Sequence, residues 1–362
     1  MTEFVHLHLH SQYSLLDGAN RLDDVIQAAA AAGMKAISLT DHGNLFGAIE
    51  FYDKAKKAGI KPIIGIEAYV AQGSLVDRNP ARGSSNHLVL LARNQTGYQN
   101  LIKLTTRSYL QGFYYKPRID HETLREFSDG LIGLSACLKG EINERILSNR
   151  EAEAEERARE YAEILGPENF FLELQDHGIP DQRAANEVLR RMAKRLGLGM
   201  VVTNDCHYLR QSDSVAHDVL LCIGTQRTRS DPDRLKYASD QFYLKSGDEI
   251  AALFPEDGEA IANTVAIAER CNVEIPSGTF HLPAFPLPPG ESIESFFEHR
   301  AMAGLEERFE EMARRGTIDS RYSMDLYRER LKFEIGVIKR MGFPGYFMIV
   351  WDFIRFARES GI

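Results

Sequence analysis

Short apolar runs alternate with amphipathic helical stretches over residues 1 to about 275, and this alternation restricts the chain to few folds. The apolar runs that we expect to be strands are residues 4–8, 36–40, 62–69, 87–92, 131–135, 170–174 and 200–203. The helical stretches between them are residues 22–32, 48–58, 98–110, 141–147, 150–165 and 182–196. Repeated strand–helix units predict parallel strands joined by right-handed crossovers. The fold class is therefore α/β, arranged either as a closed or nearly closed barrel or as an open doubly wound sheet.

A proline-rich segment divides the chain. Residues 276–290 contain five prolines, which a helix or a central strand does not tolerate, so we expect an extended linker. Helical patterns follow at residues 293–312 and 324–341, and an apolar, aromatic segment follows at 346–356. The length of 362 residues exceeds what one core usually serves. We expect a domain at 1–275 and a small, mainly helical region at 291–362 that ends as a fragment of a longer chain.

Bulk composition limits the class of protein only loosely. The net charge of −9 is opposite in sign to that of a protein that coats DNA, although an acidic chain can still carry a local basic groove. The four cysteines lack the spacing of a disulfide framework, which is typical of a reducing compartment. The sequence contains no secretory segment and no apolar run long enough to span a membrane. We therefore expect a cytoplasmic protein with no membrane contact.

Side chains that could bind metal follow most of the predicted strands. The first run has histidines at alternate positions, 6, 8 and 10, and residues two apart in a strand share a face. The C-terminal edge of an α/β sheet is where active sites form, so we expect the polar strand ends to converge there. The candidate ligands are His8, His10, Asp17, His42, Glu67, His87, Cys137, Asp205 and His207.

This mixture of nitrogen, oxygen and sulfur donors suits Zn²⁺, Mn²⁺ or Fe²⁺ better than Mg²⁺ or Ca²⁺. The set is too large for one tetrahedral site, so we expect two or three divalent ions that share bridging carboxylates. Such a cluster generates hydroxide near neutral pH and stabilises the attacking and leaving oxygens of a phosphoryl ester. The sequence therefore predicts metal-dependent hydrolysis of a phosphate ester.

Two cysteines and two histidines allow interpretations other than metal ligation. Cys137 is either a thiolate ligand or a small buried apolar side chain. His6 lies nearer the middle of its strand, where we expect it to support the ligands or to contact a substrate phosphate. His177 ends another apolar run and is a candidate substrate contact, whereas Cys206 lies between two predicted ligands and should face the core.

Four motifs resemble the polymerase-and-histidinol-phosphatase (PHP) superfamily: HxH at 8–10, TDHG at 40–43, IEAYV at 66–70 and NDxH at 204–207. Longer segments, including FVHLHLHSQYSLLDGA, YYKPRID and GYFMIVWDFIRFARESGI, resemble the N-terminal part of the family of bacterial replicative DNA polymerase III alpha subunits. The resemblance covers essentially the whole chain. It implies a distorted (β/α)₇ TIM-like barrel with up to three metal ions, whose positions fall on the nine candidate ligands.

The resemblance also implies a 3′→5′ exonuclease that removes misincorporated nucleotides from a DNA primer–template. Glu67, Asp205 and His207 are then the expected catalytic residues, with Asp205 as a candidate general base. Lys116 and Arg118 are candidates for gripping the DNA backbone, although they could equally belong to a solvated loop. A sliding clamp and a clamp loader are partners that the resemblance alone implies.

Residues from about 291 onward resemble the start of the polymerase palm and thumb, but they lack the Asp-x-Asp signature of the nucleotidyl-transfer site. We therefore expect polymerisation of the longer parent protein and not of this chain. Two alternatives remain open. The barrel could be a small-molecule phosphomonoesterase of the same superfamily, or a metal-stabilised scaffold that supports the polymerase.

Overall fold

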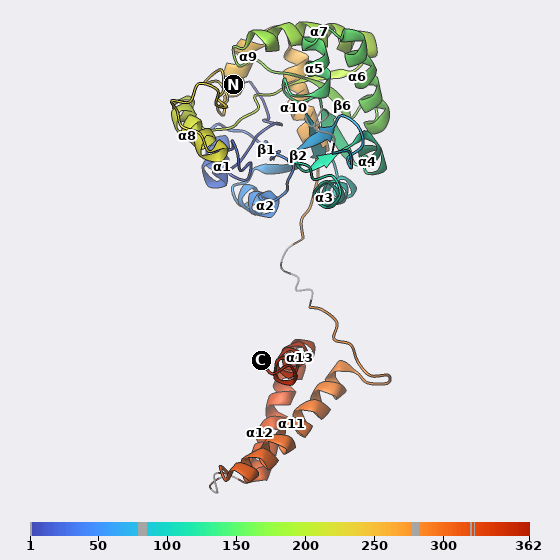
Figure 1. Cartoon of the computed structure of the whole chain (residues 1–362), viewed down its shortest axis with the longest axis vertical. Helices are drawn as coiled ribbons and strands as arrows, with labels where there is room; N and C mark the ends of the chain where they lie inside the picture. The colour runs from blue at the N-terminus through green and yellow to red at the C-terminus, as the bar shows by residue number, and fades with distance from the viewer. Residues whose placement is uncertain (1, 79–84, 277, 279–281, 319–320, 322) are drawn as a thin grey trace. The chain divides into compact units, whose positions relative to one another are not determined.

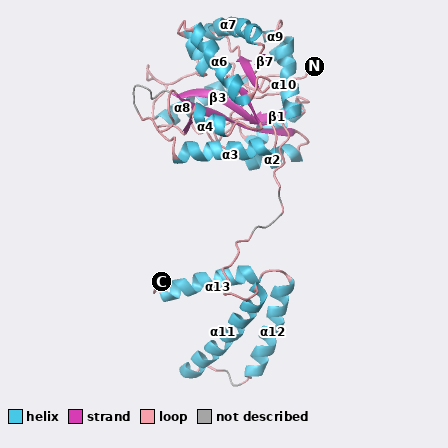
Figure 2. Cartoon of the chain, turned by 90° about the vertical axis from the view of Figure 1, so that its right-hand side faces the viewer, coloured by secondary structure: helices cyan, strands magenta, loops and turns pink. Residues whose placement is uncertain are grey.

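The computed structural model describes residues 2–78, 85–276, 278, 282–318, 321 and 323–362. It divides the chain into two compact units, Met1–Ile275 and Pro276–Ile362, which are treated separately below. The first unit consists of helices arranged around a curled sheet (Figures 1 and 2). Among the described residues, no helix has the length and apolar character needed to cross a membrane.

The sheet of the first unit has seven strands in the order β1-β2-β3-β5-β6-β7, with β4 paired to β2. The strands are β1 (Ala36–Leu39), β2 (Lys61–Ala71), β3 (Ser85–Ala92), β4 (Arg118–Ile119), β5 (Leu131–Leu134), β6 (Phe170–Leu174) and β7 (Gly199–Val202). The helices are α1 (Leu22–Ala31), α2 (Ala48–Lys57), α3 (Gln95–Leu110), α4 (His121–Glu126), α5 (Glu141–Leu147), α6 (Glu151–Leu165), α7 (Pro180–Leu196), α8 (Ser214–Thr225), α9 (Gly247–Leu253) and α10 (Gly258–Arg270). The predicted α/β class is confirmed, and the predicted elements other than the first strand end within a few residues of the observed ones.

The prediction of an all-parallel sheet is wrong at β3, which runs antiparallel to both β2 and β5. Parallel neighbours need a long crossover, usually a helix, whereas antiparallel neighbours need only a loop. The described part of the β2–β3 connection, residues 72–78, contains no helix. The short connection therefore reverses the chain direction, and the first residues of β3 lie at the C-terminal edge of the parallel strands.

The predicted first strand, residues 4–8, is extended but does not form a regular ladder. On one side, the backbone N–H of Ser38 in β1 donates to the carbonyl of His6 at 2.9 Å. On the other side, the His10 N–H donates to the Cys206 carbonyl at 2.8 Å, and the Cys206 N–H donates to the His8 carbonyl at 3.2 Å. The segment thus lies between β1 and the chain after β7 and joins the two edges of the sheet. This irregular closure produces the distorted barrel that was expected.

Strand side chains alternate between two buried clusters, as the pleat of a strand requires. The smaller cluster includes Ile63, Val89 and Phe171. Glu67, His87 and Glu173 differ from these residues by an even number of positions along the same strands, so they share that face. One face of the sheet is therefore apolar at one end and carries carboxylates and imidazoles at the other, which places the candidate site at the C-terminal edge.

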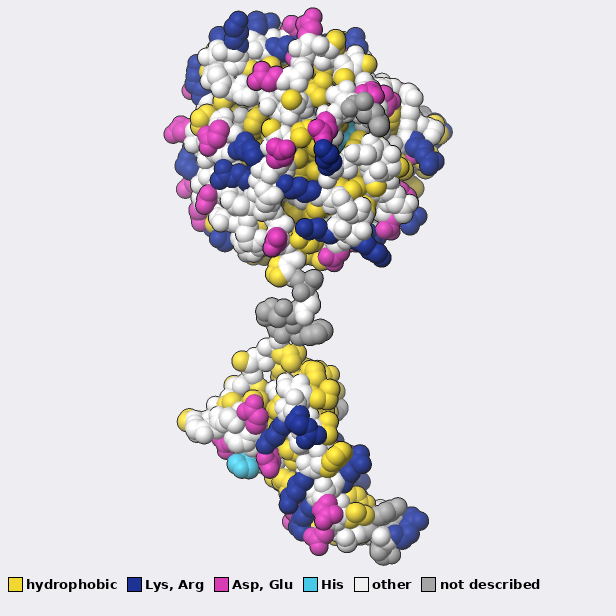
Figure 3. Space-filling view, turned by 180° about the vertical axis from the view of Figure 1, so that it is seen from behind, with side chains coloured by type: hydrophobic (Ala, Val, Ile, Leu, Met, Phe, Trp, Pro, Cys, Tyr) yellow, Lys and Arg dark blue, Asp and Glu magenta, His cyan; other side chains and the backbone are white. Residues whose placement is uncertain are grey.

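The second unit is helical: α11 (Ile293–Arg315), α12 (Met324–Arg340) and α13 (Pro344–Glu359). The three helices pack around Phe297, Ile335 and Met348. The described residues of 276–290 form no helix or strand, and residues 277 and 279–281 of the predicted linker lie outside the described part of the chain. Figure 3 shows hydrophobic side chains on the surface of this unit.

Candidate metal centre

Glu67 on β2 lies at the middle of the candidate site and is 1% exposed. Its Oε1 lies 3.3 Å from His8 Nε2 and 2.9 Å from His87 Nδ1. Its Oε2 lies 2.7 Å from His42 Nδ1 and 3.5 Å from His10 Nε2. One buried carboxylate thus contacts four imidazoles that come from three different parts of the chain.

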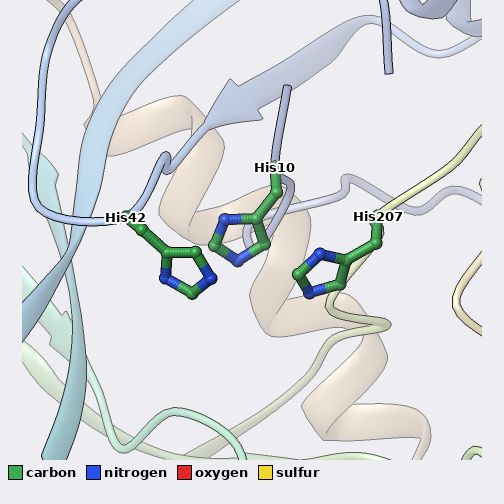
Figure 4. Close-up of side chains that lie close together, drawn as sticks. All are labelled: His10, His42 and His207. Carbon is green, nitrogen blue, oxygen red and sulfur yellow. The ribbon is translucent and has the colours of Figure 1, made fainter. Parts of the chain in front are cut away.

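Asp205 is the second carboxylate at the centre of the site and follows β7. Its Oδ1 lies 3.2 Å from both His8 Nε2 and His10 Nε2, and 3.1 Å from His207 Nε2. Its backbone has φ of 42°, in the left-handed region that non-glycine residues rarely adopt. In Figure 4 the His10 ring lies between those of His42 and His207, with ring centres 4.2 and 4.4 Å away.

Asp17 and Cys137 complete the cluster at its edges. Asp17 Oδ2 lies 3.3 Å from His42 Nε2. The Cys137 thiol, which follows β5, lies 3.7 Å from His87 Nδ1 and 3.9 Å from Glu67 Oε1. The structure therefore brings all nine predicted ligands together in one cluster. The antiparallel direction of β3 explains why a residue at the start of a strand, His87, reaches it.

The buried ligand atoms contact one another without forming well-aligned hydrogen bonds. His8 Nε2, His10 Nε2, Asp17 Oδ1, His42 Nδ1 and Glu67 Oε2 are buried and make no hydrogen bond of good geometry, although carboxylate and imidazole atoms lie as close as 2.7 Å. Polar atoms buried in this way cost free energy unless something binds them. Three groups have ligand atoms close enough to share an ion: His10, His42 and His207; His8, His10 and Glu67; and His42, Glu67 and His87. The residues present therefore fit a metal site.

The two central carboxylates are ionised. Burial opposes the charge of Glu67, but the surrounding imidazoles, His87 and His8 first among them, hold its pKa well below its usual range. Burial also opposes the charge of Asp205, and the imidazoles of His8 and His207 likewise hold its pKa well below the usual range. Both carboxylates are therefore available as anionic oxygen ligands.

The Cys137 thiol behaves differently. Burial, together with the negative charges of Glu67 and Asp205, raises the pKa of the Cys137 thiol well above its usual value. A thiolate forms there only when a cation lies beside it, because the neighbouring carboxylates repel a third negative charge. Ligation by Cys137 therefore depends on the ions that the imidazoles and carboxylates hold.

Glu173 and Tyr237 contact the cluster although they were not among the predicted residues. Glu173 on β6 accepts a hydrogen bond from His8 Nδ1 at 2.7 Å and another from the Ala136 N–H at 2.9 Å. The hydroxyl of Tyr237 lies 3.1 Å from His207 Nε2 and 3.3 Å from Asp17 Oδ2. The signal for Glu173 was present in the sequence, since an acidic residue interrupts the apolar run FFLEL. Tyr237 lies in a segment with no regular pattern, which gave no such signal.

Replacing Glu173 by glutamine should weaken metal binding by about 10- to 100-fold, because carboxylates that orient ligating histidines have effects of this size. Isothermal titration with Zn²⁺ or Mn²⁺ measures the change. Glu163→Gln, an exposed position on α6, is the matched control for the loss of one carboxylate. Equal affinities in both variants would show that Glu173 does not position His8.

Three predicted substrate contacts occupy buried positions with other partners. His6 Nε2 donates to the Lys245 carbonyl at 2.8 Å, and His177 Nε2 donates to the Asn204 carbonyl at 2.9 Å. Burial lowers the pKa of each of these imidazoles to about 4, so both are neutral at pH 7. Arg118 is 2% exposed and donates to the carbonyls of Gly112, Leu75 and Asp77. These buried contacts favour structural roles for the three residues, and substrate contact by them stays a prediction.

Lys116 remains a candidate for substrate contact. Its Nζ lies 5.3 Å from the centre of the Tyr69 ring. Tyr69 in turn packs against the rings of His42 and His87, with centres 5.7 and 5.3 Å away. One aromatic side chain therefore separates the ammonium group from the metal centre.

Comparison with known proteins identifies both units. A family model described as the PHP domain matches residues 6–177, and one described as the bacterial DNA polymerase III alpha NTPase domain matches residues 295–362. Over 99% of its length, the chain is 46% identical to the DNA polymerase III subunit alpha of Treponema pallidum (strain Nichols) and covers 30% of that protein. It is 42% identical to that of Thermus aquaticus, again over 99% of its length, and covers 34% of it.

Among solved structures, the chain is similar to a two-domain protein from Bacteroides vulgatus that contains a predicted PHP-like metal-dependent phosphoesterase. The similarity covers 57% of this chain and 52% of the other, with 15% identity and a TM-score of 0.33.

The first unit, with its cluster of histidines and carboxylates, thus carries a PHP domain, and the cluster is its candidate metal centre. The PHP match includes His8 to Cys137 and does not extend to Asp205 and His207. Over almost its whole length the chain is similar to bacterial DNA polymerase III alpha subunits, and it spans about a third of the length of the relatives it matches.

Proposed function

We propose that the PHP domain of this chain is a metal-dependent 3′→5′ exonuclease that hydrolyses the terminal phosphodiester of a mismatched DNA primer. The observation that carries this proposal is the convergence of buried imidazole and carboxylate ligand atoms at one sheet edge. Multi-metal clusters of this kind suit phosphoester hydrolysis. The family relationship to polymerases makes the DNA 3′ end the natural substrate.

Two ions would be held by His8, His10, Glu67, His87, Cys137, Asp205 and His207, and a third would be held by Asp17, His42 and Asp205. When bound, Zn²⁺, Mn²⁺ or Fe²⁺ would supply an activated water near neutral pH and neutralise charge on the scissile phosphate. Glu67 contacts the ligands of both groups and so fixes their relative position. Asp205 holds the proton of the attacking water at its carboxylate, and the 3.1 Å contact with His207 Nε2 orients that carboxylate.

We propose DNA synthesis as an activity of the longer proteins and not of this chain. Residues 295–362 match part of a polymerase III alpha family model, and residues 291–362 contain no Asp-x-Asp signature. We propose primer–template DNA as the partner of the PHP domain. Contacts with a sliding clamp and a clamp loader are proposed for the longer proteins, and no described residue of this chain is assigned to them.

The test is the release of the 3′-terminal nucleotide from a mismatched, 5′-labelled primer–template by the purified chain. We expect release with Mn²⁺ or Zn²⁺, none with chelator, and a decrease of about 100-fold or more in Asp205→Asn, since losing one catalytic metal interaction costs several kcal/mol. Asp53→Asn, at an exposed position on α2, is the matched control.

A folded, metal-loaded protein that releases no nucleotide would contradict the nuclease assignment. The scaffold alternative would then be favoured. Faster hydrolysis of p-nitrophenyl phosphate than of primed DNA would instead favour the phosphomonoesterase.

A further inference from the structure

Three aromatic side chains form an exposed row on the PHP domain, which we call the aromatic shelf: Phe46, Tyr109 and Phe113. They are 57%, 39% and 49% exposed, respectively. The ring centres of Phe46 and Tyr109 are 6.3 Å apart, and those of Tyr109 and Phe113 are 6.2 Å apart. Single exposed apolar residues are ordinary, but a contiguous group of exposed rings marks a binding surface.

Tyr69 and the loop after β1 connect the shelf to the metal centre. Phe46 belongs to that loop, three residues after Gly43. A Cβ atom on Gly43 would lie 3.2 Å from Tyr69 and 2.9 Å from Pro117, so the loop packs closely on both side chains. Phe46 thus lies in the loop that packs on Tyr69, and the Tyr69 ring contacts the imidazoles of His42 and His87.

The charge of the surroundings points to a ligand with phosphates. The ammonium of Lys116 lies over the ring of Tyr69, which contacts the imidazoles of His42 and His87. In Figure 3, lysine and arginine side chains are interspersed with acidic ones on the face shown and do not form a single basic stripe. A row of three rings with one lysine on the neighbouring Tyr69 ring favours a short ligand that combines flat apolar rings with a few phosphates.

We propose that the aromatic shelf binds the unpaired bases at the 3′ end of single-stranded DNA, with Lys116 on a backbone phosphate. This inference rests on the proposed nuclease function, because it takes the DNA end to be the occupant of the centre. Bases stack on aromatic side chains irrespective of their sequence. Paired bases already stack on one another, so the shelf selects ends that have lost pairing, such as a mismatched terminus.

Substitutions that keep or remove the aromatic ring distinguish binding of DNA from binding of an apolar protein partner. Leucine retains apolar contact but cannot stack with a base, whereas Tyr109→Phe retains the ring. The test measures binding of a 5′-fluorescein oligothymidylate with a 3′-terminal phosphorothioate by fluorescence anisotropy, with chelator present. We expect Tyr109→Leu and Phe113→Leu each to weaken binding by about tenfold, since a base–ring stack is worth about 1–3 kcal/mol. Tyr109→Phe should restore the wild-type affinity, and Ile223→Ala, 70% exposed on α8, is the distant control.

A second probe of the same length has abasic sugars at its 3′ end, and we expect the wild-type chain to bind it as weakly as the leucine variants bind the full probe. Leucine variants that fold, by circular dichroism, and bind the probe as wild type does would overturn the proposal and make the shelf a protein-docking surface. If binding depends on the rings but the wild-type chain releases no nucleotide with metal, the proposed function fails and the shelf stands. If nucleotide is released but the leucine variants bind the probe as tightly as the wild-type chain does, only the proposal for the aromatic shelf is wrong.

Discussion

Replacing Glu67 with glutamine is expected to lower metal-dependent phosphodiester hydrolysis by at least about 100- to 1,000-fold, which corresponds to a few kcal/mol of transition-state stabilisation. Glu67 is the carboxylate with the most contacts to the other ligands, since its two oxygens lie within 3.5 Å of four imidazoles. Glutamine has the same shape but no charge and only one oxygen, so it cannot bridge two ions. The loss should appear in kcat for nucleotide release from the mismatched primer.

A second measurement separates this effect from unfolding. Metal content by elemental analysis should fall in Glu67→Gln, while the circular dichroism spectrum stays that of the wild type. Glu156→Gln, at an exposed position on α6, should retain both metal and activity. Full activity of Glu67→Gln with a normal metal content would place the reaction elsewhere on the chain.

Removal of the metal ions should lower the midpoint of thermal unfolding of the PHP domain by about 5–10 °C. A ligand present at 100 times its Kd stabilises the folded state by about 2.7 kcal/mol, and each kcal/mol shifts the midpoint of a domain of this size by roughly 2–4 °C. The reason lies in the buried ligand atoms that lack hydrogen-bond partners and depend on the ions. Differential scanning calorimetry with and without chelator measures the shift.

Excess Zn²⁺ or Mn²⁺ should restore the original midpoint, which shows that the chelator acted through the ions. Asp205→Asn should show a smaller difference between the two conditions, because it removes a carboxylate that contacts three of the imidazoles. An unchanged midpoint after elemental analysis has verified that the metal is gone would show that the ions contribute nothing to stability.

The sequence predicted which side chains gather in the cluster, because their chemical types and their places at strand ends both carry information. It also predicted all-parallel strands, an arrangement in which His87 would lie at the opposite edge from Glu67. The antiparallel direction of β3 resolves that conflict, but it depends on a loop connection that apolar periodicity does not describe. The helices α4, α8, α9 and α10 were missed in the same way, because the strand–helix alternation did not require them.

Substrate contacts are harder to predict from sequence than the clustering of ligands, because residue type does not show which way a side chain points. Arg118 follows two tyrosines and a lysine in a segment that suggests contact with DNA. Its guanidinium is nevertheless buried and donates hydrogen bonds to three backbone carbonyls. These hydrogen bonds hold the surrounding loops in place. Local hydrogen bonding of this kind is fixed by the tertiary fold, and only the structure shows it. The same holds for Glu173, whose importance follows from its 2.7 Å contact with His8.

The closure of the barrel by residues 6–10 has a consequence for how the domain folds. The side chains of His6 and Cys206, which contact each other, are 200 positions apart in the chain. Contacts of such long range form slowly, because a large loop must close before they contribute stability. During synthesis, His8 and His10 therefore cannot contact Asp205 and His207 until those later residues have been added to the chain. We therefore expect metal binding to be coupled to barrel closure, so that the rate of metal incorporation reports how fast the two ends of the domain come together.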